Sequence, residues 1–173
     1  MRIQNNIPEF GIIREKEERR DGGCAVVFNP ETQLYAVGKQ MQDGLFRLFS
    51  GGVEEGEDLK EGVLREVVEE SGLYDFLYVE QIAVAFAHYY NSLRNVNRVT
   101  KTTCFLVILK SVNLVNVKLE EHEKFSLFWA TAKDILSNWE QRNENKDYDH
   151  WIYFLKKSVK RAIALEYDMT ILV

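Results

Sequence analysis

Apolar residues in the first third of the chain fall into short runs that are typical of β-strands. The runs 24–28 and 34–37 flank Asn29-Pro30, which predicts a two-stranded hairpin closed by a proline-containing turn. A third short run covers 46–49 and ends at Ser50-Gly51-Gly52, where the chain must turn sharply. We therefore expect strands to precede the first helix.

The hydrophobic period changes at residue 58. Leu59, Val63 and Val67 are spaced by four, which predicts an amphipathic helix over 58–71 with Gly72 as its C-cap. Residues 78–90 and 101–112 are rich in Val, Ile, Phe and Tyr and predict two further strands. We expect them to pair as a long hairpin across the polar loop 91–100.

The last third of the chain predicts one strand and two helices. Residues 125–130 form another short apolar run, and Thr131 to Asp134 resembles a capping box that opens a helix over 131–139. After the polar link 138–146, one apolar stripe predicts a helix over 148–165. The stripe consists of Tyr148, Trp151, Ile152, Leu155, Val159, Ala162 and Ile163. This order of elements predicts a single α+β domain over 1–173, layered around a mixed sheet.

Composition narrows the class of protein. With 46% hydrophobic and 28% charged residues the chain is globular, and its net charge of −5 offers no general attraction to nucleic acid or to an anionic membrane. Cys24 and Cys104 each lie in an apolar run, which indicates buried thiols in a reducing compartment. The chain shows neither a signal peptide nor a long apolar span, so we expect a cytoplasmic protein.

Carboxylates are concentrated on the helix predicted over 58–71. Glu66, Glu69 and Glu70 are spaced i, i+3, i+4 and share one face, where like charges destabilise the helix unless something neutralises them. A hard divalent cation with oxygen ligands, Mg²⁺ or Mn²⁺, would do so. Glu57 adds a carboxylate just before the helix, and Arg65 can steady Glu69 or Glu57. The alternative for the three glutamates alone is an ordinary solvated face.

The glycines before this helix favour a metal site over a solvated face, because Gly51 and Gly52 let the backbone approach a metal or phosphate closely. The segment 51–73 resembles the Nudix box, whose pattern is Gly, five residues, Glu, seven residues, then Arg-Glu-apolar-any-Glu-Glu-any-Gly-apolar. Its nine defined positions are met by Gly51, Glu57, Arg65, Glu66, Val67, Glu69, Glu70, Gly72 and Leu73. The seven fixed identities would coincide by chance about once in 10⁸ starts. Ser50 stands where many members have proline, and Gly62 slightly weakens the helix.

The resemblance implies the Nudix αβα sandwich and a Mg²⁺- or Mn²⁺-dependent pyrophosphohydrolase. Such an enzyme cleaves a nucleoside diphosphate linked to another group, by attack of metal-activated water on a phosphorus. The substrate expected here is a small nucleotide, either a dinucleoside polyphosphate or a nucleoside triphosphate. The alternative is a Nudix-fold module that binds a nucleotide without cleaving it, which the complete box disfavours. No long nucleic acid is expected, because mRNA decapping would need a basic channel or an accessory domain.

By the same resemblance, the box supplies the metal ligands. Glu66 and Glu70 are the first candidates, Glu69 is a third ligand or the catalytic base, and the carbonyl of Gly51 is a further candidate ligand. Glu57 and Arg65 would orient these groups.

In many members of the family the base is instead a glutamate in a loop before a late strand. Glu120, Glu121 and Glu123 occupy that place, and we rank Glu123 first among them. An exposed acidic turn is the alternative for each.

The region after the box offers candidates for substrate binding. Tyr89 and Tyr90 lie where a tyrosine marks Nudix members that resemble dinucleoside polyphosphate hydrolases, and either ring would stack on a base. Ordinary packing in the sheet is the favoured alternative. Arg94 and Arg98 lie in the polar stretch 91–101 and would grip a phosphate or a base, although a solvated hairpin tip is favoured.

The histidines and several cationic side chains outside the box are weaker candidates for a functional site. His88 is a candidate to face the cleft, but none of His88, His122 and His150 has the spacing of a metal ligand. Arg19 and Arg20, before the first core strand, raise the same question of phosphate binding as Arg94. A cationic side of the last helix is interpreted as solvated, with a second subunit and hence a homodimer as the alternative. That side carries Lys156, Lys157, Lys160 and Arg161.

Overall fold

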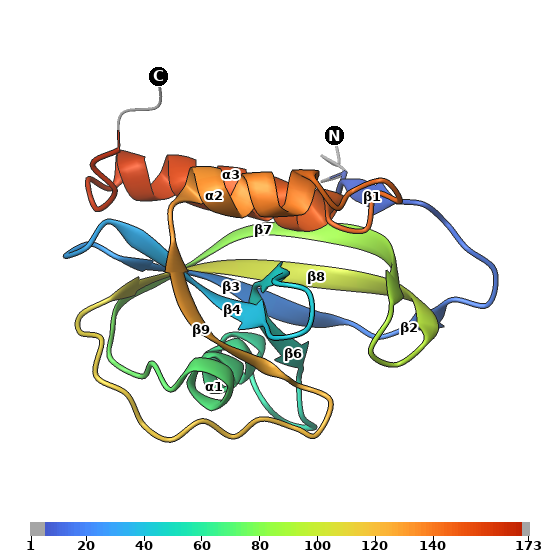
Figure 1. Ribbon diagram of the computed structural model, residues 1–173, viewed down its shortest axis with the longest axis horizontal. Coiled ribbons are helices and arrows are strands. Elements are labelled where there is room, and N and C mark those ends of the chain that lie inside the picture. The colour runs from blue at the N-terminus through green and yellow to red at the C-terminus, as the bar shows by residue number, and fades with distance from the viewer. Residues whose placement is uncertain (1–5, 171–173) are drawn as a thin grey trace, which may run out of the picture.

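The computed structural model describes residues 6–170, which form one sheet with helices on both faces (Figure 1). In chain order the elements are β1 (Glu9–Gly11), β2 (Glu18–Arg19), β3 (Gly22–Asn29), β4 (Leu34–Gln40), β5 (Phe46–Arg47), β6 (Phe49–Gly52), α1 (Leu59–Ser71), β7 (Phe76–Asn91), β8 (Val96–Leu109), β9 (Phe125–Ala130), α2 (Ala132–Glu140) and α3 (Asp149–Ala164).

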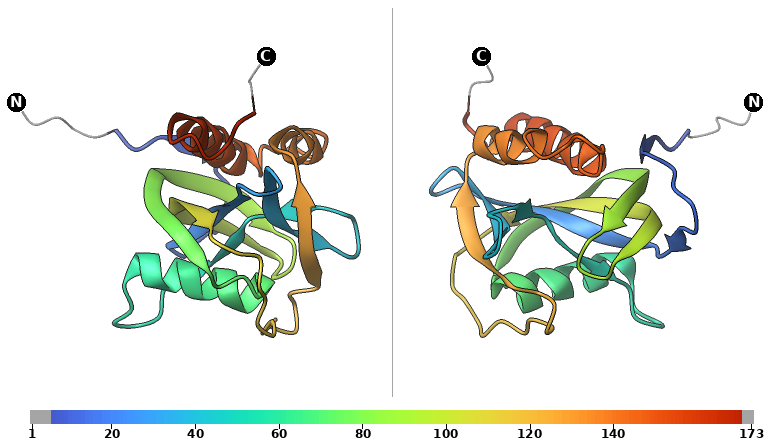
Figure 2. Two further views of the ribbon diagram at one scale, coloured as in Figure 1. Left: turned by 90° about the vertical axis from the view of Figure 1, so that its left-hand side faces the viewer. Right: turned by 45° about the vertical axis from the view of Figure 1, so that its right-hand side comes forward.

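The sheet is mixed, and its main path runs β1-β7-β8-β3-β4-β5, with β2, β6 and β9 paired to β8, β3 and β4. β3 pairs with β8 in parallel, whereas β7 and β8 pair as the long antiparallel hairpin that the sequence predicts. Helices α2 and α3 cover one face and α1 covers the other (Figure 2). These layers confirm the predicted α+β sandwich. None of the helices within residues 6–170 is long and apolar enough to cross a membrane.

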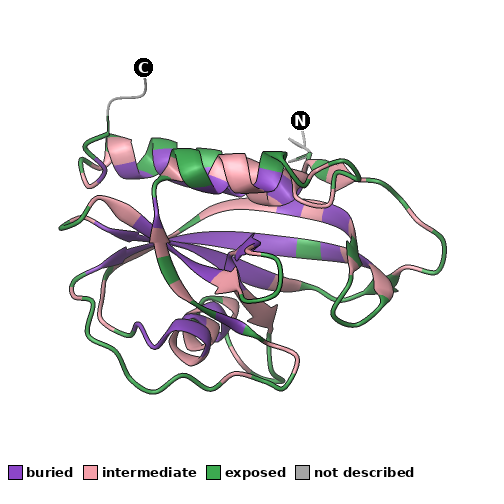
Figure 3. Ribbon diagram, in the orientation of Figure 1, coloured by how far each residue is buried: buried purple, intermediate pink, exposed green. Residues whose placement is uncertain are grey.

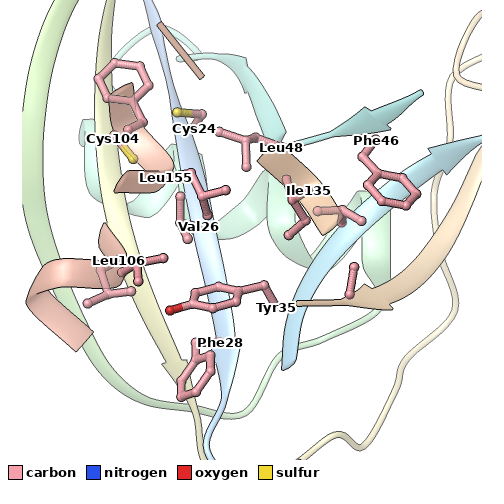
Figure 4. Packing of buried hydrophobic residues seen from close by; sticks show 14 of the residues in the cluster. Cys24, Val26, Phe28, Tyr35, Phe46, Leu48, Cys104, Leu106, Ile135 and Leu155 are labelled. Carbon is pink, nitrogen blue, oxygen red and sulfur yellow. The ribbon is translucent and has the colours of Figure 1, made fainter. Parts of the chain in front are cut away.

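The central strands β3 and β8 carry the core on both of their faces (Figure 3). Val26 and Leu106 point toward α2 and α3, in the cluster drawn in Figure 4, while Val27 and Val107 pack on the α1 side. Strands buried on both faces have continuous apolar sequences instead of alternating ones. This explains the unbroken runs around the two cysteines, which are both buried free thiols.

The helix boundaries agree with the predicted caps. Asp58 caps α1, its side chain accepting a hydrogen bond from the Glu61 N–H at 3.3 Å, and Gly72 ends the helix with a φ of 82°. Thr131 caps α2 and accepts from the Asp134 N–H at 3.1 Å. Helix starts and stops set by short-range hydrogen bonds can be seen in local sequence.

Two predictions about strands were wrong in detail. The predicted polar loop 91–100 is much shorter, because β8 already begins at Val96 and pairs with β7 up to Asn91. Arg98 and Thr100 are polar but buried, and their polarity made a strand segment resemble a loop. The predicted run 46–49 is split at Leu48 into β5 and β6, which pair with different strands.

The segment Glu9 to Arg19, here called the N-terminal strap, forms two short strands that the sequence did not reveal. In Figure 1 the strap runs around one end of the sheet, with β1 parallel to β7 and β2 parallel to β8. It closes on His88, whose Nε2 lies 2.6 Å from Glu9 and whose Nδ1 lies 2.9 Å from Glu17. Strands of only two or three residues, Glu-Phe-Gly and Glu-Arg, are too short to show a hydrophobic period, so only tertiary pairing identifies them.

The His88 contacts make the stability of the protein depend on pH. Burial by itself would lower the pKa of His88, but its hydrogen bonds to Glu9 and Glu17 raise the pKa overall. The protonated imidazole therefore stabilises the folded state fully below the unfolded pKa of about 6.5, and this contribution is lost as pH rises through the higher folded pKa. In urea unfolding at pH 6 and pH 9, the His88→Gln variant should be destabilised relative to wild type more at pH 6. An equal difference at both pH values would contradict this.

Candidate active site

A cleft of about 240 Å³ opens beside the Gly51-Gly52 strand. Its walls come from elements far apart in sequence: β3 and β6, helix α1, the β7–β8 hairpin, the segment 120–123 before β9, and the start of α3 at 147–151. Several residues that the sequence singled out line this cleft together. They are Gly51, Glu66, Glu69, Tyr89, Tyr90, Arg94, Arg98 and Glu123.

One end of the cleft is acidic. Helix α1 presents Glu66 and Glu69 to it, three residues apart on one face of the helix, as the spacing predicts. Glu123 approaches from the segment before β9, and its carboxylate accepts a hydrogen bond from the Glu120 N–H at 2.9 Å. We call this the carboxylate end of the cleft.

Arg65 holds the box carboxylates in place. Its Nε donates to Glu57 at 2.8 Å, and its Nη1 donates to both Glu66 and Glu69 at 3.1 Å. These hydrogen bonds lower the pKa of Glu57 and raise the pKa of Arg65. Gly62 also becomes intelligible here, because a Cβ at that position would lie 2.8 Å from the Glu57 carboxylate. The arrangement suits an orienting role for Arg65 and Glu57, which themselves lie outside the cleft lining.

Glu70 lies behind the cleft wall. It is 4% exposed, and one carboxylate oxygen accepts a hydrogen bond from the Ser50 N–H at 3.1 Å. Burial raises the pKa of Glu70 first, and the negative charges of Glu123 and Glu66 raise it further. Burial likewise raises the pKa of Glu66, with Glu69 and Glu123 adding to the effect. The carboxylates are therefore close enough to repel one another across the contact between α1 and β6.

The donor set fits a hard divalent cation in its chemistry. All the candidate groups are oxygens, which is what Mg²⁺ and Mn²⁺ prefer, and a cation would relieve the repulsion. A Cβ at Gly51 would lie 2.3 Å from the Glu66 carboxylate, so glycine leaves that carboxylate free to touch the backbone. As the side chains stand, no three His, Cys, Asp or Glu residues within 6–170 form a ready metal-binding group. Arg65 and the Ser50 N–H hold carboxylate oxygens for which a cation would compete.

Arginines also line the cleft, in a chain whose net charge is −5. Arg94 lies on the hairpin tip, 41% exposed and 3.6 Å from Glu120, whereas Arg98 is buried within β8 and only 3.1 Å from Glu18. The solvated-tip interpretation is thus wrong for Arg98. Arg20 also lines the cleft, as does Arg47, which the sequence analysis missed. Only its place four residues before Gly51 could have drawn attention to Arg47.

The other end of the cleft is aromatic and is lined by Tyr89, Tyr148, His150 and Trp151. The Tyr89 and His150 rings stack at 5.5 Å between centroids, and Tyr148 lies 5.6 Å from Trp151. Burial lowers the pKa of His150 to about 3, so its imidazole is neutral at physiological pH. The sequence predicted only a packing stripe for Tyr148 and Trp151, because helical periodicity does not show which apolar residues border a cleft.

Tyr90 and His88 flank Tyr89 on β7 and alternate with it in side-chain direction. Tyr90 is 43% exposed, its hydroxyl hydrogen-bonds to Asn95, and its N–H donates to Asp147 at 3.2 Å. The expectation that His88 faces the cleft is wrong. Because side chains alternate along β7, His88 points to the opposite face from Tyr89 and is held by the N-terminal strap.

Comparison with known proteins identifies the class. A family model described as NUDIX domain matches residues 18–152, and the chain therefore belongs to the Nudix hydrolase family, whose members act on pyrophosphate bonds. The match includes the whole box and most of the cleft. A comparison with curated proteins gives no match.

Solved structures show the same fold at low sequence identity. The NUDIX domain of Shewanella oneidensis NrtR, complexed with ADP ribose, has a TM-score of 0.57 and 19% identity, covering 83% of this chain and 92% of its own. The C. elegans Ap4A hydrolase has a TM-score of 0.53 and 15% identity, covering 85% of this chain and 99% of its own. The MutT protein of Methanosarcina mazei Go1 has a TM-score of 0.52 and 19% identity, covering 86% and 98%.

Gly51 gives a direct test of this geometry. A Gly51→Ala variant would place a methyl group against the Glu66 carboxylate, so that this side chain or strand β6 must move. We expect kcat/KM to fall on the order of a hundredfold, with thermal unfolding nearly unchanged. Ser50→Ala is the matched control, since it keeps the Cβ on the same strand and its hydroxyl makes no hydrogen bond within the described residues. Comparable activity of both variants with wild type would argue against a crowded functional contact.

Proposed function

We propose that the protein hydrolyses a nucleoside diphosphate linked to another group, with water attacking a phosphorus of the pyrophosphate and Mg²⁺ (or Mn²⁺) as cofactor. The observation that carries this proposal is the lining of one cleft, which has box carboxylates at one end, aromatic rings at the other and several arginines along its walls. A nucleotide has the complementary order of groups, with a polyphosphate at one end and a planar base at the other.

Glu66 and Glu70 are the residues proposed to hold the cation, with Glu69 and the Gly51 carbonyl as further ligands. When bound, the cation neutralises charge on the phosphate oxygens and lowers the pKa of water. Arg65 and Glu57 contribute by keeping Glu66 and Glu69 in fixed positions, through the hydrogen bonds described above.

Glu123 is the stronger candidate for the base. Glu69 already accepts a hydrogen bond from Arg65 at 3.1 Å, which favours its charged form and restricts its movement. Within residues 6–170 the Glu123 carboxylate accepts a hydrogen bond only from the Glu120 N–H of its own loop, and Glu123 lines the cleft. A loop carboxylate opposite the helix is well placed to take a proton from water that approaches a phosphorus between them.

Arg47 and Arg20 are proposed to hold the phosphate chain. Neither forms an ion pair with a described residue, so both guanidinium groups are available to an anion. Burial raises the pKa of Glu70, Tyr89 and Tyr148, and the positive charge of Arg47 offsets part of each rise, so Arg47 lies within electrostatic reach of both ends of the cleft. Guanidinium groups bind phosphate oxygens in bidentate geometry.

The substrate classes proposed are a dinucleoside polyphosphate and a nucleoside triphosphate, in the reducing cytoplasm that the two buried free thiols favour. A second candidate is a module that binds a nucleotide without cleaving it. The NrtR NUDIX domain, whose structure contains ADP ribose, is the observation that keeps this candidate in view. Turnover separates the two functions.

The first test is a panel of dinucleoside polyphosphates, ADP-ribose, nucleotide sugars and nucleoside triphosphates, incubated with Mg²⁺ and separated by ion-exchange chromatography. One class should be turned over, and Glu66→Gln and Glu70→Gln should each reduce kcat on the order of a hundredfold or more. Glu61→Gln, on the same helix away from the cleft, is the matched control and should retain activity. Saturable binding of a nucleotide without any turnover would favour the binding module.

The base is tested separately. Glu123→Gln should lower kcat by about 10²- to 10⁴-fold and leave the Mg²⁺ concentration for half-maximal rate nearly unchanged, because the residue is not assigned as a ligand. Glu121→Gln, an exposed neighbour, is the control. If Glu69→Gln gives this result and Glu123→Gln remains active, the base is Glu69.

A further inference from the structure

Polar groups without a protein partner gather at the aromatic end of the cleft. Arg98 is the first. Its side chain is 10% exposed and its Nη1 donates to Glu18 at 3.1 Å, but its Nε is enclosed and has no hydrogen-bond partner within the described residues. No described residue accepts from Nη2 either. The side of the guanidinium that carries Nε and Nη2 therefore has two neighbouring N–H donors without an acceptor from the described part of the protein.

His150 is the second such group. It is 5% exposed and lines the cleft, yet its enclosed Nδ1 has no partner within residues 6–170. A buried ring nitrogen without a partner costs stability, and natural structures retain such groups mainly where they serve a function. The hydroxyl of Tyr89, which stacks on His150, also hydrogen-bonds to no described residue.

The surroundings are those of a site for a planar ring. Tyr148 and Trp151 supply flat aromatic surfaces at the start of α3, and Tyr89 supplies another from β7. Aromatic rings beside unpaired polar groups favour a flat heterocyclic ligand with hydrogen-bonding edges. A purely apolar ligand would leave the polar groups of Arg98, His150 and Tyr89 unpaired.

We propose that the aromatic end binds a nucleobase of the substrate, and that Arg98, supported by His150, selects guanine over adenine. This inference rests on the proposed function, because it assumes that the ligand is a nucleotide. Arg98 can only donate hydrogen bonds, so its free side requires two neighbouring acceptors. Guanine presents O6 and N7 side by side, whereas adenine presents an N6 donor next to N7.

A phosphate also presents neighbouring acceptors, and the location argues against it here. Arg98 lies opposite Tyr89 in the β7–β8 ladder and is already paired with Glu18. Arg20 and Arg47 form no ion pair within the described residues, and they lie near the box, Arg20 beside Gly52 and Arg47 within electrostatic reach of Glu70. A phosphate on Arg98 is therefore an outcome of the test and not the proposal.

The experiment measures binding of GMP, AMP and guanosine to the full-length protein by calorimetry, which requires no turnover. Wild type should bind GMP about five- to a hundredfold more tightly than AMP, and guanosine should bind detectably. Arg98→Met keeps the chain length, removes the donors and leaves only the exposed Glu18 unpaired, so it should abolish the preference. Lys101→Met, an exposed residue of the same strand, should bind as wild type does.

His150→Phe separates binding from a structural role. It keeps an aromatic ring and removes nitrogens that pair with nothing in the fold, so its melting temperature should equal or exceed that of wild type while the preference for GMP falls. A lower melting temperature with an unchanged preference would show that His150 only packs.

Two results would overturn the proposal. One is equal affinity of wild type for GMP and AMP. The other is an equal loss of affinity for both in Arg98→Met with no binding of guanosine, which would assign Arg98 to phosphate. Neither result bears on hydrolysis, which the Glu66→Gln comparison tests independently. Conversely, tight GMP binding without turnover of any nucleotide would leave this inference standing and refute the proposed function.

Discussion

Mutual repulsion among carboxylates at the contact between α1 and β6 is the constraint around which the site is built. Glu66, Glu69 and Glu70 share one helix and cannot separate, and the packing of that helix on β3 and β8 keeps Glu66 and Glu70 close enough to be repelled by Glu123. Arg65 and the Ser50 N–H offset part of the repulsion. The repulsion that is not offset favours the binding of a positive charge at this position, and the packing of the core maintains it.

The parts of the structure that could be predicted are those determined by neighbours in sequence. Helix α1, its caps and its face of glutamates follow from spacing alone, and so do the apolar strands buried on both sides. Arg98 shows where such reasoning stops: a polar stretch with Asn and Arg resembles a loop, and only pairing with β7 and with the strap makes it a strand. Arg47 and His150 likewise acquire a role only when distant elements meet at the cleft.

The two ends of the cleft differ in how their polar groups are satisfied. At the carboxylate end each of Glu66, Glu69, Glu70 and Glu123 has one oxygen that accepts a hydrogen bond from the protein, and these bonds position groups for chemistry. At the aromatic end Arg98 and His150 keep enclosed nitrogens without partners, which costs stability in the absence of a ligand. Active sites commonly retain such unfavourable groups, because the energy is recovered when the proper ligand binds.

The N-terminal strap has a consequence for the order of folding. Its pairing joins residue 9 to residue 86 and residue 18 to residue 98, so each contact closes a long loop for only two or three ladder positions. Loop closure of that kind is entropically costly and contributes little until the β7–β8 hairpin already exists. We therefore expect the strap to join the sheet late in folding and to open first, although it precedes the other strands in sequence. Amide hydrogens of β1 and β2 should accordingly exchange with solvent long before those of β3 and β8.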